Sequence, residues 1–309
     1  MSIYLPLAEM SLSLPLLLAL GFAVGVISGM FGIGGGFIMT PLLIFLGVPP
    51  GIAVGTGASQ VTATSISSAI GHWQRGNVDA PMGVYLIAGG LIGSALGVQL
   101  QALLKSLGQL EIFIALCYVV MLGTIGSLML IEGLNAVFKR RSTGTAPMRR
   151  KGHHNALHKL PFKQRFRASK LYVSVLPLLA IGILVGWLTA IMGVGGGFLL
   201  VPALVYLMRV PTRVTLGTSA FQIIFITIAT TLLQSVSNHS VDVLLALPLM
   251  LGGVIGAQIG VQLGARLAAE QLRIVLALLV LAVAVRMAAF MVIEPESHFA
   301  IETIAAVAD

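Results

Sequence analysis

Charged residues are scarce in this sequence. Asp, Glu, Lys and Arg make up 9% of its 309 residues, whereas 57% are hydrophobic and the mean hydropathy is +1.02. A soluble domain carries charge on about a quarter of its residues, so this composition excludes an ordinary soluble protein. Long apolar runs recur along the chain, rich in Leu, Ala, Gly and Ile and without the alternation of strands. They predict an all-α, polytopic membrane protein rather than a barrel.

Cysteines and catalytic motifs are also nearly absent. The one cysteine, Cys117, lies within an apolar run, which excludes an intrachain disulfide and indicates a small buried side chain. No Walker A, H-E-x-x-H or G-x-S-x-G motif occurs, so we predict a protein that is not an enzyme and needs no cofactor. The N-terminal residues lack the basic region and A-x-A site of a cleaved signal peptide, so the first apolar run is expected to be retained.

Acidic residues are missing from the basic middle of the chain. Residues 139–170 hold 11 of the 18 Lys and Arg residues, which is typical of a cytoplasmic loop in contact with anionic lipids. Charge confined to one loop does not indicate nucleic acid binding. No Cys, Asp or Glu accompanies His153, His154 and His158, so no metal site is predicted. We divide the chain into a first transmembrane repeat (1–137), a basic cytoplasmic loop (138–170) and a second transmembrane repeat (171–309).

The two halves are copies of one pattern. Apolar segments fall at about 13–33, 37–48, 52–72, 82–104 and 110–132, and again at about 173–193, 198–209, 214–235, 243–267 and 271–293. Gly25 matches Gly186 at an offset of 161 residues, Gln60 matches Gln222 at 162, and GGLIGSALGVQL (89–100) matches GGVIGAQIGVQL (252–263) at 163. So few gaps over about 100 residues indicate an internal duplication.

The short second segment decides whether the repeats are parallel or inverted. Its 12 residues make a helix of about 18 Å, less than a hydrocarbon core of about 30 Å, so it either re-enters or crosses beside a helix break. If it crosses, each half has five crossings, and Lys105 is the one basic residue outside. The connections that then lie inside carry Arg75, Arg209, Arg213, Arg266 and Arg273. This bias favours inverted repeats with both termini outside, an arrangement typical of secondary transporters.

Three consecutive glycines precede the short segment of each half, at 34–36 and 195–197. Glycine permits positive φ and leaves backbone N–H groups free to face a ligand. The helix that follows begins near Phe37 or Phe198, and its N-terminus favours anions. The alternative is close packing of helices through small residues. We predict that Gly34, Gly35, Gly36, Phe37, Gly195, Gly196, Gly197 and Phe198 form a mid-membrane anion site.

The third segment of each half is unusually polar. Thr56 and Gln60 share one helix face, as do their equivalents Thr218 and Gln222, and we predict that these residues line the pathway together with Ser59 and Ser219. Hydrogen bonds to the helix backbone are the alternative. Further candidates for gating or charge are His72, Arg286, Gln99 and Gln262, although Arg286 can also snorkel outward. Asp79 and Asp242 precede matched spans and are expected to be helix N-caps.

One motif occurs in both halves, at 25–41 and 186–202: G-x-x-[ST]-[GA]-x-x-G-[IV]-G-G-G-F-x-x-x-P, followed each time by G-T and Gln. The sequence resembles the sulfite exporter TauE/SafE family in this motif and in HWQRGNVD at 72–79. The resemblance implies a bacterial inner-membrane permease for sulfur-containing anions, with sulfite favoured over organosulfonates or thiosulfate. By that resemblance the glycine stretches belong to a central site. In an inner membrane, the termini that the charge distribution places outside face the periplasm. An anion channel, a non-transporting sensor or adaptor and a membrane enzyme are the alternatives, and a homodimer stays open.

Overall fold

The computed structural model describes residues 2–143, 163–166, 169, 171–208, 210–266 and 269–292. Its helices follow the apolar segments of the sequence. The first half contains α1 (Leu14–Phe31), α2 (Gly36–Phe45), α3 (Pro50–Gln74), α4 (Ala80–Ser106) and α5 (Leu110–Thr143). The second contains α6 (Val175–Met192), α7 (Gly197–Pro202), α8 (Thr212–Leu233), α9 (Val243–Arg266) and α10 (Ala269–Val292), with π-helical turns η2 (Ala203–Leu207) after α7 and η3 (Gln234–Asn238) after α8.

The prediction of an all-α polytopic membrane protein is confirmed. Six helices of the described chain are long and apolar enough to cross a membrane. The polar helix α3 is not one of them, although its 25 residues span about 38 Å at 1.5 Å per residue. It lies inside the bundle, with Thr56, Gln60 and Thr64 fully buried. Neighbouring helices therefore shield the polar residues of α3 from lipid.

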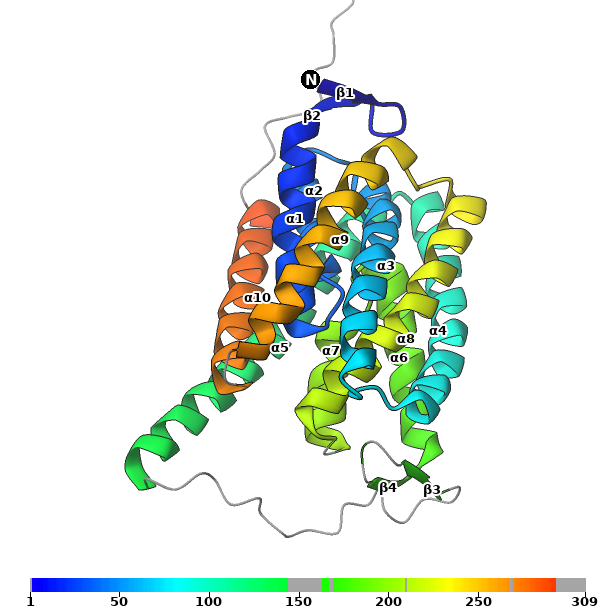
Figure 1. Ribbon diagram of the computed structural model, residues 1–309. Helices are drawn as coiled ribbons and strands as arrows, with labels where there is room; N and C mark the ends of the chain where they lie inside the picture. Colours follow the sequence, from blue (N-terminus) through cyan, green and yellow to red (C-terminus); the bar gives the residue numbers. More distant parts are fainter. Residues whose placement is uncertain are drawn as a thin grey trace, which may run out of the picture.

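Equivalent helices of the two halves run in opposite directions (Figure 1). Helix α1 runs away from the N-terminal end of the molecule and α6 runs toward it, and the same contrast holds between α3 and α8. Leu7, Gln101 and Asn238 line one pocket, so they share one end of the bundle, here called the Leu7 end. Asp79 bonds Ser169 at the opposite end, here called the Ser169 end.

Glycine allows helices of different halves to touch backbone to backbone. A Cβ added to Gly25 of α1 would lie 2.3 Å from the carbonyl oxygen of Gly253 in α9, and one added to Gly186 of α6 would lie 2.0 Å from that of Gly90 in α4. These two contacts are equivalent under the duplication. Small residues give membrane helices this close approach, which maximises van der Waals contact where no hydrophobic effect drives association.

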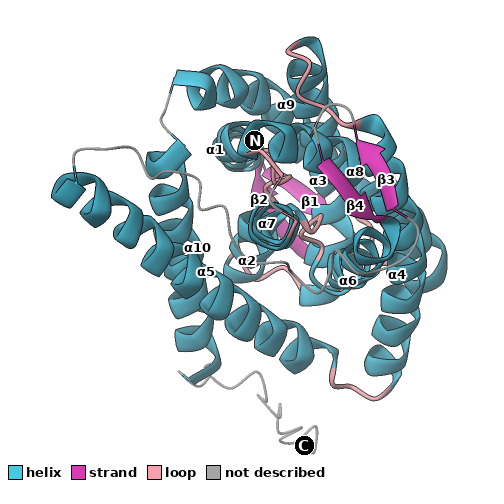
Figure 2. Ribbon diagram, turned by 90° about the horizontal axis from the view of Figure 1, so that it is seen from below, coloured by secondary structure: helices cyan, strands magenta, loops and turns pink. Residues whose placement is uncertain are grey.

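The two short helices lie within the bundle. Figure 2 looks along the bundle from the Ser169 end and places α7 near its centre, whereas α5 and α10 pack together at the edge. The rings of Phe37 in α2 and Phe198 in α7 have centroids 6.3 Å apart. The two glycine stretches thus meet in the middle of the protein.

Two β-hairpins that the sequence analysis did not predict precede the first helix of each half. Strand β1 (Ser2–Leu5) pairs antiparallel with β2 (Met10–Ser13), and β3 (Lys163–Phe166) pairs with β4 (Leu171–Ser174). Ser2 pairs with Ser13 and Lys163 with Ser174, so the duplication extends to the start of the described chain. Helix α5 continues to Thr143, and both α5 and β3 therefore occupy parts of the segment predicted as a basic loop.

Candidate functional site

The glycine stretches have the backbone conformation expected of them. Gly34 and Gly35 have φ of +83° and +72°, and Gly195 and Gly196 have +77° and +70°. An L side chain rarely adopts these angles. The C-cap residues of α1 and α6 are Gly32 and Gly193, each in the left-handed conformation. The chain thus breaks twice, at equivalent places, and a new helix begins four residues after each of these glycines.

Each break leaves a row of free backbone donors. Within the described residues, none of the N–H groups of 33–37 or 194–198 donates a hydrogen bond. All ten residues are buried. Buried N–H groups without a partner are rare in folded proteins because desolvation is not compensated. Successive N–H groups in left-handed turns form concave anion-binding surfaces, so these two rows are the strongest chemical signal in the protein.

The two glycine stretches contact each other. A Cβ added to Gly36 would lie 2.5 Å from the carbonyl oxygen of Gly193, and one added to Gly197 would lie 2.5 Å from the Cα of Ile33. The side chain of Val61 in α3 lies between them, since a Cβ on Gly34 or Gly195 would approach its Cγ1 within 2.7 or 2.6 Å. No larger residue fits at these positions, and the surface beside the donors is apolar.

Two buried glutamines, one in each polar helix, have no hydrogen bonds in the described structure. The amides of Gln60 and Gln222 are 0% exposed, and neither their nitrogen nor their oxygen atoms have a partner in the described structure. The amide nitrogen of Gln60 lies 2.9 Å from the Cβ position of Gly253 in α9, and that of Gln222 lies 3.6 Å from the Cβ position of Gly90 in α4. An amide buried without hydrogen bonds lowers the free energy of unfolding by about 1–3 kcal/mol. Such unpaired polar groups are typical of ligand-binding sites.

Thr64 links Gln60 to the first glycine stretch. It follows Gln60 by one helical turn on the same face of α3, and its hydroxyl donates to the carbonyl oxygen of Gly34 at 3.2 Å. In the second half, the hydroxyl of Ser219 donates to the carbonyl oxygen of Gly32 at 3.0 Å. Polar side chains of α3 and α8 thus hold the carbonyl groups of the first glycine stretch and leave its N–H groups free.

Other predicted pathway residues have structural partners. The hydroxyl of Thr56 accepts a hydrogen bond from the N–H of Asp242, and that of Thr218 accepts one from the N–H of Asp79, both at 3.0 Å. Ser59 donates to the carbonyl of Gly55 one turn earlier, at 3.5 Å. These residues join α3 and α8 to the starts of α9 and α4, and of the polar pairs only the glutamines stay unbonded.

The expected helix caps are confirmed. The carboxylate of Asp79 accepts from the N–H of Met82 at 3.4 Å, and that of Asp242 accepts from the N–H of Leu245 at 3.2 Å. The second oxygen of Asp79 also binds the N–H of Ser169 at 2.9 Å. The second oxygen of Asp242 accepts from the N–H of Leu7 at 3.3 Å, so each cap ties one half of the chain to the segment that precedes the first helix of the other half.

The candidates for gating do not gather at one place. His72 is buried at the Ser169 end, and neither ring nitrogen has a partner among the described residues. Arg286 is exposed on α10, with its guanidinium 5.2 Å from the ring centroid of Phe45. Gln99 and Gln262 are both exposed on the outside of the bundle. Of these four residues, only His72 is buried.

A network of buried amides near the Leu7 end was missed by the sequence analysis. The amide nitrogen of Gln234 donates to the side-chain oxygen of Gln101 and, at 3.0 Å, to the carbonyl of Ala190. Asn238 donates to the oxygens of Gln101 and Gln234 at 3.2 and 2.8 Å. Several amides within apolar helices were the available signal, but their proximity depends on contacts between the two halves.

No cluster of three or more His, Cys, Asp or Glu residues capable of holding a metal occurs in the described part of the chain. His153, His154 and His158 lie outside the described residues. The binding chemistry that the described centre offers consists of N–H donors, hydroxyls and amides. Such groups suit a small anion held by hydrogen bonds.

Comparisons with known proteins identify relatives over most of the chain. The family described as "Sulfite exporter TauE/SafE" matches residues 17–287. A probable membrane transporter protein of Xylella fastidiosa (strain 9a5c) is 31% identical over 237 residues, which cover 76% of this chain and 77% of that protein. The probable membrane transporter protein YunE of Bacillus subtilis (strain 168) is 27% identical over 255 residues, covering 78% and 85% of the two chains. The sulfite exporter TauE/SafE family protein 3 of Arabidopsis thaliana is 30% identical over 95 residues, 30% of this chain and 20% of that protein. No solved structure matches the chain.

Proposed function

Because the chain belongs to the sulfite exporter TauE/SafE family, whose relatives include probable membrane transporters, we propose that it exports sulfite or a related small sulfur-containing anion by alternating access. The observation that carries this proposal is the pair of buried N–H rows at 33–37 and 194–198, which donate no hydrogen bond within the described residues. An oxyanion supplies the acceptors that these donors lack. Gln60 and Gln222 would complete its coordination from α3 and α8.

The two halves form an inverted pair in this proposal. Its support is the opposite direction of α1 and α6 and the equivalence of the Gly25–Gly253 and Gly186–Gly90 contacts. A binding site between inverted repeats is reached from one side or the other when one repeat rocks against its partner. The central contacts of Val61 with Gly34 and Gly195 would have to separate in each cycle to admit the anion.

We assign the Leu7 end to the outside and the Ser169 end to the cytoplasm. The basic segment 139–170 includes the last residues of α5 and strand β3, which belongs to the hairpin at the Ser169 end. Arg75 belongs to the connection between α3 and α4 at that end, whereas Lys105 lines the pocket at the Leu7 end. This distribution follows the positive-inside rule for a bacterial inner membrane. The N-terminus would then be periplasmic.

Export is the direction that the membrane potential favours. With the cytoplasm negative, each anionic charge that leaves gains about 2.3 kcal/mol per 100 mV. Among the described residues, the buried carboxylates are those of Asp79 and Asp242, and both cap helices. Neither is free to hold a coupling cation or carry protons through the bundle centre, which fits an anion that leaves without one.

The test is transport in proteoliposomes with the purified full-length protein. We expect sulfite efflux that saturates, is driven by an imposed potential without a proton gradient, and shows counterflow when sulfite is also present outside. Flux without saturation or counterflow would indicate a channel instead. Efflux that needs a proton gradient and ignores the potential would overturn uncoupled export, and absence of any sulfite flux would overturn the proposed substrate.

A further inference from the structure

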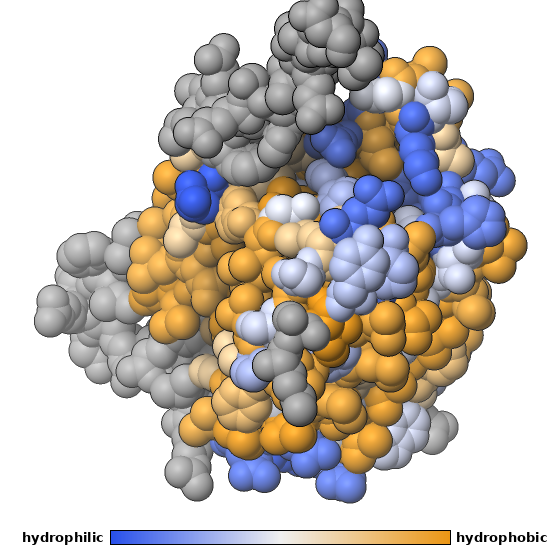
Figure 3. Space-filling view, turned by 90° about the horizontal axis from the view of Figure 1, so that it is seen from above, coloured by the Kyte–Doolittle hydropathy of each residue, from blue (hydrophilic) through white to orange (hydrophobic). Residues whose placement is uncertain are grey.

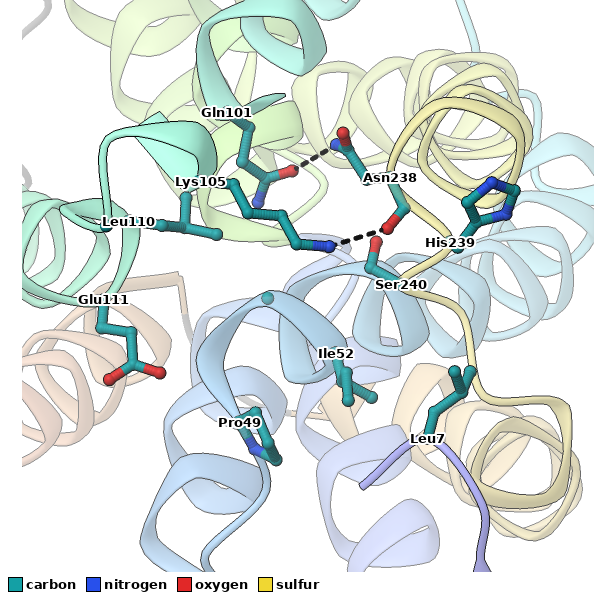
Figure 4. A pocket seen from close by; sticks show the side chains of 12 residues that line it. Leu7, Pro49, Ile52, Gln101, Lys105, Leu110, Glu111, Asn238, His239 and Ser240 are labelled. Carbon is teal, nitrogen blue, oxygen red and sulfur yellow. Dashed lines mark hydrogen bonds between the residues drawn. The ribbon is translucent and has the colours of Figure 1, made fainter. Parts of the chain in front are cut away.

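A pocket at the Leu7 end lies apart from the central site. Its volume is about 410 Å³, and it lies between α3, α4, α5 and the turn that precedes α9. Figure 3 looks onto this end and shows hydrophilic side chains gathered on a face that is otherwise apolar. We name it the Lys105 pocket, and Figure 4 shows the residues that line it: Leu7, Pro49, Gly51, Ile52, Gln101, Lys105, Gly108, Leu110, Glu111, Asn238, His239 and Ser240.

Lys105 supplies a positive charge to this pocket. Its ammonium donates to the carbonyl oxygen of Asn238 at 3.1 Å, which fixes its position and leaves two of its three donors free. Within the described residues it forms no ion pair. The one acidic residue in the lining, Glu111, extends away from the Lys105 ammonium (Figure 4). The charge of Lys105 is therefore available to a ligand.

Gln101 supplies an unsatisfied buried donor. The side chain is 2% exposed, and its amide nitrogen has no hydrogen-bond partner in the described structure. Its orientation is fixed, because the Gln234 amide nitrogen donates both to the carbonyl of Ala190 and to the Gln101 oxygen. Asn238 donates to the same oxygen at 3.2 Å. If the nitrogen and oxygen of Gln101 were exchanged, its NH₂ group would face the NH₂ groups of Gln234 and Asn238, which are donors too. The Gln101 NH₂ group must therefore face away from the network.

Two long helices begin at the wall of this pocket. Gly51 and Ile52 lie in the first turn of α3, and Leu110 and Glu111 in the first turn of α5. Their backbone N–H groups donate no hydrogen bond within the described residues. Helix N-termini attract anions through free donors and the helix dipole. The pocket thus combines a lysine, an unpaired amide and two helix starts, all of which favour negative charge.

We propose that the Lys105 pocket is a second anion-binding site, which holds a small sulfur oxyanion at the outer mouth of the pathway. The choice of anion rests on the proposed function, whereas the preference for negative charge does not. Buried polar groups lead inward from the pocket. Gln101 contacts Gln234 in η3. One turn before Gln234, Thr230 of α8 forms a hydrogen bond with Ser94 at 2.8 Å. The amide network separates the Lys105 pocket from the centre, so an exported anion would rest in the pocket before release.

Binding measurements test this site independently of transport. The central site is first disabled by combining Gly35→Leu and Gly196→Leu, whose side chains displace its two rows of N–H donors, and purified full-length protein is titrated with sulfite, methanesulfonate and chloride at constant ionic strength. We expect this background to bind sulfite, Lys105→Gln to weaken binding at least tenfold, and Gln101→Leu to weaken it several-fold. Arg213→Gln is the matched control, because it removes one exposed charge outside the pocket lining and should leave sulfite affinity unchanged.

The two proposals fail in different ways. If Lys105→Gln and Arg213→Gln bind sulfite equally, or if chloride competes as well as sulfite does, the Lys105 pocket is not an oxyanion site. Saturable transport by the wild type would still support the proposed function in that case. If the background binds sulfite through Lys105 while the wild type transports none, the second site stands and the proposed function fails. Size-exclusion chromatography and thermal unfolding of each variant exclude misfolding as the cause.

Discussion

The hydroxyl of Thr56 accepts a hydrogen bond from the backbone N–H of Asp242, 186 positions away in the sequence, at 3.0 Å. Its duplicate, Thr218, does the same for Asp79 at the same distance. Each bond joins a polar helix of one half to the first turn of a helix in the other half. The threonines that were predicted to line the pathway therefore stabilise the contact between the two halves. The two hydrogen bonds occupy equivalent positions in the duplicated halves.

Replacing Thr56 by valine should destabilise the protein. The N–H of Asp242 would be buried without an acceptor, which costs about 1–3 kcal/mol. We expect this loss in the free energy of unfolding measured by denaturant titration in detergent, with little change in the KM for sulfite. Thr124→Val is the control, because the Thr124 hydroxyl is exposed and bonds only carbonyls of its own helix. Equal stability of both variants would contradict the assignment.

Replacing Gly35 or Gly196 by leucine should abolish transport and spare membrane insertion. Both residues have positive φ, and a Cβ would lie 2.9 Å from Val24 Cγ1 or 2.2 Å from Val185 Cγ1. The new side chain would displace the row of N–H donors. The measurement is sulfite efflux per inserted protein. Gly76→Leu is the control, because Gly76 also has positive φ, at +66°, but has open space around its Cβ position.

Normal flux in Gly35→Leu or Gly196→Leu would remove the glycine stretches from the site. Loss of flux in Gly76→Leu as well would show that positive φ alone, rather than crowding at the centre, accounts for the defect. The expected pattern is two inactive variants and one active variant, all of them inserted.

Replacing Gln60 or Gln222 by leucine should lower transport at least tenfold while stability stays equal or rises. Leucine removes an unsatisfied buried amide, which favours the folded state by about 1 kcal/mol or more. Gln99→Leu and Gln262→Leu are matched controls, because they are duplicates of each other and are exposed. If these controls lose transport and the buried pair does not, the pathway follows the outer face of α4 and α9 instead.

Replacing Gly256 by alanine should separate α1 from α9. A Cβ at this position would lie 2.1 Å from the carbonyl oxygen of Phe22, a backbone atom that cannot rotate away. We expect a loss near the upper end of the 1–3 kcal/mol typical of overpacking. Gly123→Ala in α5, with no atom within 4 Å of its Cβ position, should be neutral or slightly stabilising because alanine favours the helix. Unfolding transitions of the two variants provide the comparison.

Much of the helix layout could be predicted from the sequence because apolar runs and the duplication mark each helix independently. The positive φ of Gly34 and Gly195 also followed from residue type. The hairpins were not predictable in this way, since strands of four residues carry too little pattern to distinguish them from loops. Ser2–Leu5 and Lys163–Phe166 differ in charge, although they occupy equivalent places.

It was harder to predict from the sequence which side of each helix faces the inside of the bundle. Gln99 is exposed and Gln101 is buried, although they lie two residues apart on α4. Two residues correspond to about 200° of rotation, so a correct phase is needed to choose between them. In a soluble helix the apolar stripe gives that phase. On α4 both the lipid-facing and the protein-facing sides are apolar, and only contact with α6 and α8 decides which glutamine is inside.

The glycine contacts between α1 and α9 have a consequence for the order of synthesis. Helix α1 ends at Phe31, whereas its partner α9 begins only at Val243, so α1 is synthesised more than 200 residues before α9. Until α9 has been synthesised, the face of Gly21, Gly25 and Gly29 must therefore lie against lipid or against other helices. Synthesis of the second half buries the glycine faces of both halves. Helix α6 packs against α4, which is already present, and α9 then covers the glycine face of α1. The two halves reach their native packing only after α9 has been synthesised, and a truncated first half would present an uncovered glycine surface to any similar half nearby.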